Sequence, residues 1–183
     1  HSGWRLVDEK GEKISDIELW HGSLELDLET WVVWKPVTIS MMFRRSWIKS
    51  AGGFNTNWHH GEDIDLVLRL SMNGCEAVWL PKVTYCYRQH RRNATRKSTQ
   101  QAVSMMSVLD NFFSQPNLSA SIRQLEGKSR YYTLSWLAWQ AHRNGNLVEM
   151  DKYLRQAVKY TPLSMTETIY HWVDSFNSLY QQY

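Results

Sequence analysis

The sequence is poor in the features that mark secreted and membrane-spanning proteins. It has two cysteines, Cys75 and Cys86, too few to staple a small secreted domain, so we expect two buried free thiols in a reducing compartment. No apolar run approaches the roughly 18 residues that cross a bilayer, and no basic segment followed by an apolar stretch opens the chain as a signal peptide would. These absences predict a soluble protein in the cytoplasm, either free or at the periphery of a membrane.

The composition also excludes a disordered chain. Hydrophobic residues make up 43% and aromatic residues 13% of the 183 residues, which is enough apolar surface to build a core. The chain begins at His1 rather than at a methionine and enters strand-like sequence almost at once. We therefore expect it to be part of a longer protein.

Charge is distributed unevenly along the chain, whose formal net charge is +3. Between residues 82 and 97 basic side chains follow one another without an intervening acid, and their field attracts phosphate groups. The basic residues of this run are Lys82, Arg88, Arg91, Arg92, Arg96 and Lys97. Tyr85 and Tyr87 are interleaved with them, so a nucleic-acid-binding module that stacks bases on these rings is one alternative function.

The first residues predict a β-hairpin. Residues 4–7 alternate as a strand does, residues 8–11 supply turn chemistry, and residues 12–14 fit a returning strand. Residues 23–30 place leucines at every second position with acids between them. This pattern leaves a strand and a short helix open, and we favour the helix.

Short elements follow in the middle of the chain. The apolar, partly β-branched residues 37–43 predict a buried strand, and residues 44–51 predict a short helix that stops at the glycine pair behind it. Residues 75–80 and 83–87 read as two further strands on either side of Pro81.

A longer helix is predicted between Gly61 and Gly74. Its first turn contains Glu62, Asp63 and Asp65, and its apolar residues fall on one stripe. Asp65 and Arg69 are spaced as an i, i+4 ion pair.

A change in composition near residue 98 divides the chain. Residues 1–97 mix strand and helix patterns, whereas residues 98–183 are helical throughout. The helices expected there span residues 99–114, 119–143, 147–160 and 165–183. The predicted fold is mixed α/β and predominantly helical, with residues 98–183 as a helical extension.

Residues 131–164 of this extension resemble one tetratricopeptide repeat. The residues that match the 34-residue pattern are Tyr131, Leu137, Ala138, Gly145, Leu154, Ala157 and Pro162. A lone repeat cannot bury its own face, so a helical hairpin that packs on the neighbouring helices is the plainer interpretation. A helical protein-interaction module is a second alternative function.

The densest group of reactive side chains is Trp58-His59-His60-Gly61-Glu62-Asp63-Ile64-Asp65. A carboxylate at a helix start can act as a general base where it faces a cleft, but acids in a first helical turn are also stabilised by the helix dipole without any function. His59 and His60 are interpreted as loop or surface residues rather than metal ligands.

The spacing over a longer stretch resembles the second half of a family 2 glycosyltransferase. The residues that carry the resemblance are Ser40-Met41-Met42-Phe43-Arg44-Arg45, Gly52-Gly53-Phe54-Asn55, Gly61-Glu62-Asp63-Ile64-Asp65-Leu66-Val67-Leu68-Arg69-Leu70, Gly74 and Tyr87-Arg88-Gln89-His90-Arg91-Arg92-Asn93. Such enzymes have the GT-A fold, in which a nucleotide-sugar-binding half precedes an acceptor-binding half. The resemblance implies that residues 1–97 are the acceptor-side part of a GT-A-like domain.

The resemblance also implies roles for residues of the glycine pair and of the acidic helix start. Gly52 and Gly53 correspond to the glycine loop near the sugar donor, and Asp63 to the catalytic base. Glu62 would support that base or bind the acceptor. The implied reaction is an inverting transfer of a sugar from a nucleotide-sugar donor to a saccharide or other hydroxyl acceptor.

Further along the chain, the resemblance makes His90 the histidine that reaches a divalent metal, Mg²⁺ or Mn²⁺, on the donor diphosphate. Arg88 and Arg91, beside it, would add positive charge for the phosphates. In the family the rest of the metal site is an Asp-x-Asp motif that follows a strand, and no such motif precedes residue 37. We interpret Asp63-Ile64-Asp65 as part of the helix start and not as that motif. The metal site is then incomplete in this chain, and we expect the 183 residues alone to be inactive.

Two triplets fit the glycosylation sequon, Asn93-Ala94-Thr95 and Asn117-Leu118-Ser119. Without a secretory signal we interpret both as chance matches.

Overall fold

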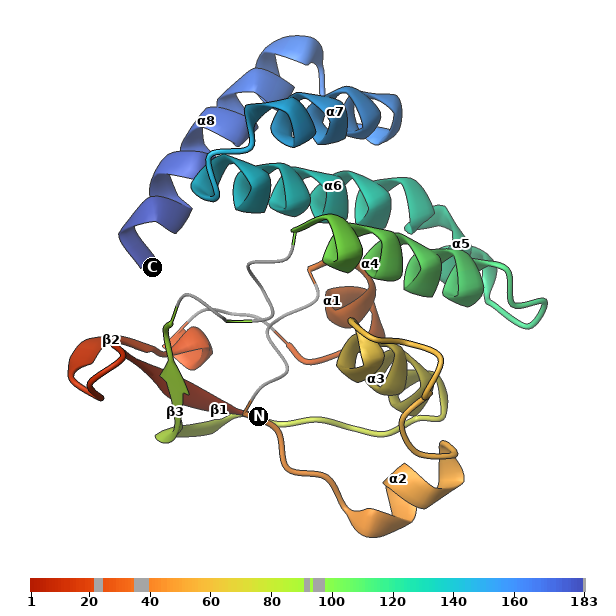
Figure 1. Cartoon of the computed structure of the whole chain (residues 1–183). Helices are drawn as coiled ribbons and strands as arrows, with labels where there is room; N and C mark the ends of the chain where they lie inside the picture. The colour runs from red at the N-terminus through yellow and green to blue at the C-terminus, as the bar shows by residue number, and fades with distance from the viewer. Residues whose placement is uncertain (22–24, 35–39, 91–92, 94–97, 183) are drawn as a thin grey trace. The chain divides into compact units, whose positions relative to one another are not determined.

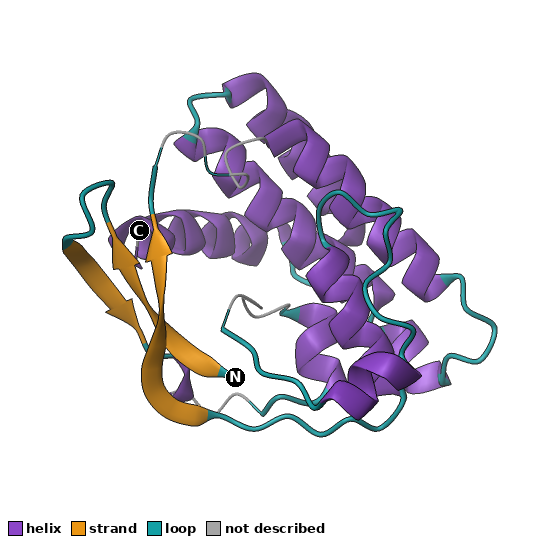
Figure 2. Ribbon diagram, turned by 60° about the horizontal axis from the view of Figure 1, so that its bottom comes forward, coloured by secondary structure: helices purple, strands orange, loops and turns teal. Residues whose placement is uncertain are grey.

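The computed structural model describes the chain apart from residues 22–24, 35–39, 91–92, 94–97 and 183. The chain divides into two compact units, His1–Asn93 and Ala94–Tyr183. The first unit combines strands with short helices, and the second is helical (Figures 1 and 2). The expectation of a mixed, predominantly helical chain is confirmed.

Three strands form the sheet of the first unit, in the order β2-β1-β3 (Figure 2). β1 (Ser2–Val7) pairs antiparallel with β2 (Lys13–Ile17), which confirms the predicted hairpin. β3 (Leu80–Arg88) pairs parallel with β1. Trp4 and Leu6 of the central strand are 2% and 1% exposed, so β1 contributes large apolar side chains to the core.

The prediction of two strands around Pro81 is wrong, because β3 runs through the proline as one strand. Ser2 pairs with Leu80 and Gly3 with Val83, so Pro81 and Lys82 fall into an irregularity between two paired positions. A proline is tolerated at such a bulge because its missing N–H interrupts no ladder hydrogen bond there. Residues 75–79, expected in the first strand, are not strand.

Short helices complete the first unit. A 3₁₀ turn, η1 (Leu19–His21), is followed by α1 (Leu28–Val33), whose N-cap Asp27 accepts a hydrogen bond from the Thr30 N–H at 2.8 Å. The helix predicted for residues 23–30 therefore begins only at Leu28, near the end of that range. Residues 22–24 lie outside the described residues. α1 packs against α3 (Glu62–Met72), the helix predicted between Gly61 and Gly74.

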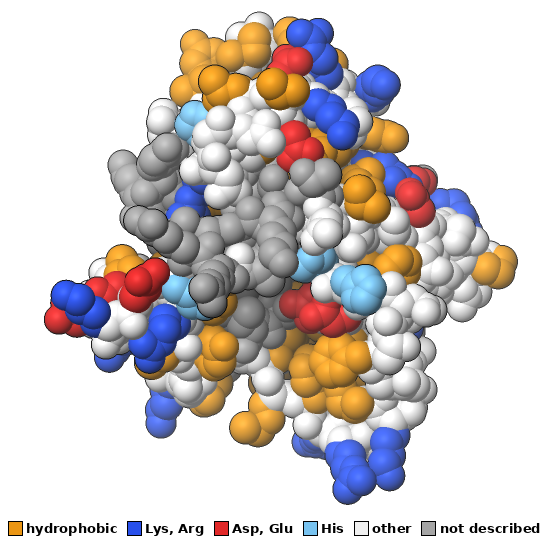
Figure 3. Space-filling view, in the orientation of Figure 1, with side chains coloured by type: hydrophobic (Ala, Val, Ile, Leu, Met, Phe, Trp, Pro, Cys, Tyr) orange, Lys and Arg blue, Asp and Glu red, His pale blue; other side chains and the backbone are white. Residues whose placement is uncertain are grey.

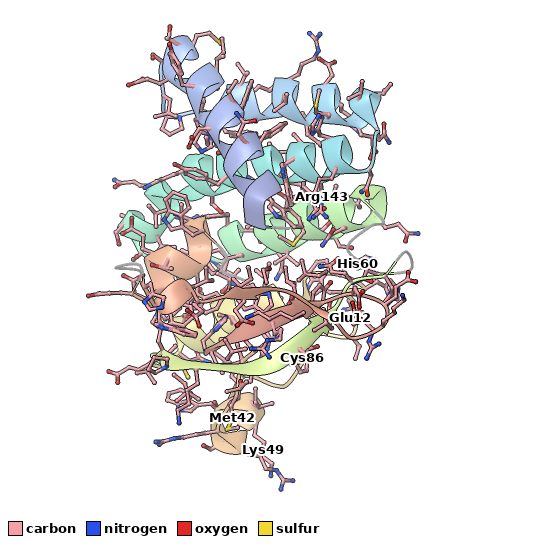
Figure 4. All side chains as sticks on the ribbon, turned by 90° about the vertical axis from the view of Figure 1, so that its left-hand side faces the viewer. Glu12, Met42, Lys49, His60, Cys86 and Arg143 are labelled. Atoms are coloured by element: carbon pink, nitrogen blue, oxygen red, sulfur yellow. The ribbon has the colours of Figure 1, made fainter. Side chains whose placement is uncertain are left out.

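The buried strand predicted for residues 37–43 is wrong for its described part. Residues 40–43 form no strand, while residues 37–39 lie outside the described residues. Ser40 joins β1 through its carbonyl, which accepts from the Ser2 N–H at 3.1 Å, but Met42 is 95% exposed. The apolar run thus leads out to α2 (Arg45–Ser50), an expected helix with no buried residue, where Met42 and Lys49 lie at the end of the unit (Figure 4).

The second unit contains five α-helices among its described residues, with one 3₁₀ turn after the fourth (Figure 1). They are α4 (Ser98–Phe113), α5 (Ala120–Gln124), α6 (Glu126–Arg143), α7 (Leu147–Ala157), η3 (Val158–Tyr160) and α8 (Met165–Gln182). The single helix predicted for residues 119–143 is wrong. It is interrupted at Leu125, which ends α5 and caps α6, and Gly127, a weak helix former, follows.

The core of the second unit forms where α6 and α7 pack against each other. Leu137, Ala138 and Ala157 have no exposed surface, and small side chains at the last two positions allow the helices to approach closely. α8 adds Trp172 and Phe176 to this core. Within the described part of the chain, none of the helices combines the length and the apolar character that a membrane span requires.

The expectation of two buried thiols is wrong. Both cysteines are free, but Cys86 on β3 is exposed and Cys75 is partly exposed. The neighbours of Cys86 on the strand, Thr84 and Tyr85, whose side chains alternate between the two faces of the sheet, are exposed as well, so this part of β3 is accessible to solvent.

Candidate active site

The predicted glycine loop follows α2 directly. Gly52 and Gly53 have φ angles of +79° and +73°, a conformation that residues with a Cβ rarely adopt. The Gly53 N–H donates to the Ile48 carbonyl at 2.9 Å, which closes the end of α2. Among the residues that the structure describes, none lies within 4 Å of a Cβ built on either glycine, so they leave this backbone open to the close approach of a ligand.

The acidic residues begin α3. Gly61, at φ +78°, turns the chain into the helix, and Glu62 and Asp63 are its first two residues, both half-buried. Asp63 accepts the N–H of Ile64 at its Oδ1, at 2.8 Å. Carboxylates in this position are stabilised by the N-terminal end of the helix dipole. The geometry therefore keeps a carboxylate at the helix start and partly accessible.

The glycine loop and α3 are joined by Arg69. Its guanidinium donates to the carbonyl oxygens of Ala51 and Gly53, the latter at 2.9 Å, and forms an ion pair with Asp65 at 2.7 Å. Asp65 is 4% exposed, so its carboxylate is committed to this pair. This commitment agrees with the interpretation that Asp63-Ile64-Asp65 is not a metal-binding Asp-x-Asp motif.

Arg88 and His90 lie at the carboxyl end of β3. The Arg88 guanidinium donates from Nη1 to the Glu9 carbonyl in the hairpin turn at 2.8 Å. Asn93, which is 7% exposed, accepts the His90 N–H at its Oδ1 at 2.7 Å and donates from Nδ2 to the Arg88 carbonyl at 3.0 Å. Arg91, the other predicted phosphate contact, lies outside the described residues.

Sequence reasoning missed two residues that organise the site. The sequence predicts Arg69 as the partner of Asp65 but not as a ligand of the glycine loop, and it places Asn93 in the family motif and in a sequon without predicting its hydrogen bonds. The buried amide of Asn93 makes two hydrogen bonds, which leaves this triplet unsuited to glycosylation. A side chain that bonds to backbone carbonyls has no recognisable sequence signal, because any residue type offers the same carbonyl.

The described residues do not make a metal site by themselves. Among them, no group of three or more histidine, cysteine, aspartate or glutamate side chains is gathered that could hold an ion. His90 is half-buried at the end of β3 and would supply one ligand. A divalent metal near it would need further ligands from elsewhere.

Two searches, one of curated proteins and one of solved structures, find no significant match to the chain. A family model, that of glycosyl transferase family group 2, matches residues 29–177. The match includes the glycine loop, the acidic start of α3 and the end of β3, and it continues through the second unit into α8. The resemblance read from the sequence is therefore confirmed, and the chain belongs to glycosyl transferase family group 2.

Proposed function

We propose that this chain is the acceptor-side portion of an inverting glycosyltransferase, which moves a sugar from a nucleotide-sugar donor to an acceptor hydroxyl. Family membership supports glycosyltransferase activity. The observation that carries the finer proposal is the link between the Gly52-Gly53 loop and α3, whose first turn holds Glu62 and Asp63. A cytoplasmic location, expected from the sequence, is part of this proposal.

Asp63 is the catalytic base in this scheme. Its carboxylate takes the proton of the acceptor hydroxyl while that oxygen attacks the anomeric carbon, and the bond from this carbon to the diphosphate oxygen breaks. Attack from the side opposite to the leaving group inverts the anomeric configuration. Glu62, its neighbour in the first turn of α3, binds the acceptor or supports the base.

The donor lies against the open face of the glycine loop. Gly52 and Gly53 let its sugar approach the backbone, since no side chain of the described residues lies within 4 Å of either glycine's Cβ position. Arg88 and Arg91 offer guanidinium groups to the diphosphate, where charge-assisted hydrogen bonds are strong. The contact from Arg88 to the Glu9 carbonyl fixes its guanidinium near the end of β3.

A divalent metal, Mg²⁺ or Mn²⁺, belongs to the intact enzyme in this proposal, with His90 as one ligand. The described residues do not complete a metal site, so its other ligands would come from elsewhere in that enzyme. In the enzyme that carries this chain, His90→Ala should raise the metal concentration that gives half-maximal activity. Arg91→Ala should weaken donor binding and leave the metal requirement nearly unchanged. An unchanged metal titration for His90→Ala would remove His90 from the site.

The helical unit is proposed to contain one tetratricopeptide-like hairpin at residues 131–164. Its support is the close packing of α6 on α7, which are joined by three residues, with Ala138 and Ala157 fully buried. Figure 3 shows hydrophobic side chains gathered over α7 and α8. These helices and the end of α6 also form a groove of about 370 Å³, which is lined by His142, Leu147, Met150, Ile169, Trp172 and Val173. If α6 and α7 approach each other as closely as the helices of that repeat, Ala157→Leu should lower the stability of the second unit. Ala120→Leu, at an exposed position of α5, should lower it less.

Two experiments test the proposal. Titration calorimetry of the 183 residues with UDP-glucose and GDP-mannose, with Mn²⁺ present, should show no binding at micromolar concentration, because the proposal assigns nucleotide binding to a different half of the enzyme. Clear metal-dependent binding would show this assignment to be wrong. For the enzyme that carries this chain, NMR of the first product formed should show the anomeric configuration opposite to that of the donor, and a retained configuration would contradict the mechanism.

A further inference from the structure

Arg69 has hydrogen-bond partners on two separate segments of the first unit. The carbonyl oxygens of Ala51 and Gly53, on either side of Gly52, both accept from its guanidinium. Asp65 Oδ2 accepts from Nε at 2.9 Å and from Nη2 at 2.7 Å. The side chain of Arg69 is 26% exposed, so most of this network is shielded from water.

Only an arginine can satisfy this set of acceptors. The guanidinium is planar and directs five N–H groups in a fixed fork, whereas a lysine ammonium is a point donor that cannot reach carbonyls on one side and a carboxylate on the other with the same geometry. The carboxylate of Asp65 holds the fork in place because the two residues are one helical turn apart.

The glycine loop depends on such an external contact. Two successive glycines with positive φ have greater backbone freedom than other residues, and ordering them costs correspondingly more free energy. A loop that is ordered before the donor arrives does not lose that freedom on binding, which favours affinity. The two carbonyl contacts to Arg69 order the loop on α3, the helix that begins with Glu62 and Asp63.

We propose that Arg69 is a positioning residue that sets the Gly52-Gly53 loop against α3 and thereby prepares the donor-facing backbone. The inference rests on the proposed function, since it takes this loop to face the donor. Arg69 acts through the loop, and the proton transfer remains the task of Asp63. Asp65 orients Arg69 and therefore contributes to the position of the loop indirectly.

The second unit supplies a matched control. Asp151 and Arg155 on α7 form the same i, i+4 pair, with Nε and Oδ2 2.7 Å apart, but their side chains are 58% and 77% exposed. Arg155→Lys therefore makes the same substitution in an i, i+4 ion pair with an aspartate, but on a solvent-exposed surface.

The test measures donor KM and kcat in the enzyme that carries this chain, using whichever member of a panel of UDP-, GDP- and dTDP-linked sugars it consumes. Arg69→Lys should raise donor KM on the order of tenfold, a change that follows from a misplaced loop. The pH dependence of kcat should not shift, because Asp63 keeps its surroundings. Asp65→Asn should act in the same direction with a smaller effect, and the double variant should be no worse than Arg69→Lys alone, since the two residues act as one unit. Arg155→Lys should leave KM within about twofold of the unmodified enzyme.

A second measurement needs no known donor. Hydrogen exchange of the backbone amides at residues 52–54 should be faster in Arg69→Lys and unchanged in Arg155→Lys. The proposal would be overturned by an unchanged donor KM in a folded Arg69→Lys variant, or by equal effects of the two arginine variants. Arg69 would then only stabilise the fold. If Arg69→Lys does not fold, the KM and exchange rates of Asp65→Asn decide in the same way. Full activity of Asp63→Asn would instead refute the proposed base, and the effect of Arg69→Lys on KM would still report on the loop.

Discussion

The candidate site in the first unit and the core of the second unit use polar side chains differently. At the candidate site, Arg69 bonds to the backbone of Gly53, and Asn93 bonds to the backbone of Arg88 and His90. In the second unit, Arg123 also donates to backbone carbonyls, those of Phe113 and Gln115. The polar contacts at its core, however, connect one helix to another: the Tyr131 hydroxyl on α6 lies 2.8 Å from His171 Nδ1 on α8, and Trp172 Nε1 donates to Ser135.

This difference indicates a division of tasks. Side-chain bonds to loop backbone fix irregular segments whose own conformation is weakly determined, and binding residues commonly lie on such segments. Bonds between helices fix only how regular elements pack. The bonds of Arg69 and Asn93 therefore suit the irregular segments of the candidate site, and those of Tyr131 and Trp172 suit a core of packed helices.

The largest expected effect is on that core. Leu137 is fully buried on α6, so Leu137→Ala should reduce the free energy of unfolding of the second unit by about 2–5 kcal/mol. Denaturant titration followed by circular dichroism measures the loss, and hydrogen exchange locates it. If the backbone amides of residues 52–54 lose as much protection as those of α6, the loss of the core would also destabilise the candidate site, which would contradict the comparison.

A smaller effect is expected at the end of β3. Asn93→Ala removes a buried amide with two backbone partners and should cost about 1–3 kcal/mol, because the His90 N–H and the Arg88 carbonyl lose their acceptor and donor. The matched control is Asn117→Ala, at the other sequon and exposed, which should change stability little. Thermal unfolding of both variants makes the comparison, and equal shifts in Tm would contradict the role of Asn93.

The contact between α6 and α8 predicts a pH effect in the second unit. Burial lowers the pKa of His171 below its ordinary value of 6.5, although the Asp174 carboxylate opposes that shift. A histidine whose folded pKa is depressed contributes stability that is present above pH 6.5 and is lost as the pH falls through the folded pKa. Tm measured between pH 8 and pH 5 should fall more steeply for the unmodified chain than for His171→Gln. Identical slopes would show that His171 titrates as it does in the unfolded chain.

The smallest effect distinguishes the two thiols. Cys86 is exposed on β3, whereas burial raises the pKa of the Cys75 thiol. Because the thiolate is the reactive form, iodoacetamide at pH 8 should modify Cys86 first. Mass spectrometry of digests taken at successive times measures the order of labelling. Faster labelling of Cys75 would contradict the greater exposure of Cys86.

The sequence predicts the regular elements better than the contacts that organise the site. The acids after Gly61 and the glycine at residue 74 mark α3 correctly, because helix ends have strong residue preferences. The strand at residues 40–43 was mispredicted because apolar content does not distinguish a buried strand from an exposed segment such as that around Met42.

The candidate site follows the same rule. Sequence spacing indicates which residues belong to it, but the link from Arg69 to Ala51 and Gly53 joins positions 18 and 16 residues apart and depends on the tertiary fold. Pro81 inside β3 is a similar case, since its tolerance depends on the pairing register with β1. Neither could be derived from the local pattern. The acceptors of Arg69 are backbone carbonyls, which are the same at every residue, and the position of Pro81 depends on how β3 pairs with a distant strand.

The most direct test of the central claim compares Asp63→Asn with Asp65→Asn in the enzyme that carries this chain. Asp63→Asn should lower kcat by a factor of roughly 10² to 10⁴, which is typical for loss of a general base, with an unchanged circular dichroism spectrum. Asp65→Asn should change kcat much less, because that carboxylate pairs with Arg69 and does not meet the acceptor. Comparable losses of kcat in the two variants, or a collapsed spectrum for Asp63→Asn, would contradict the account and leave the acids of α3 with only their role at the helix start.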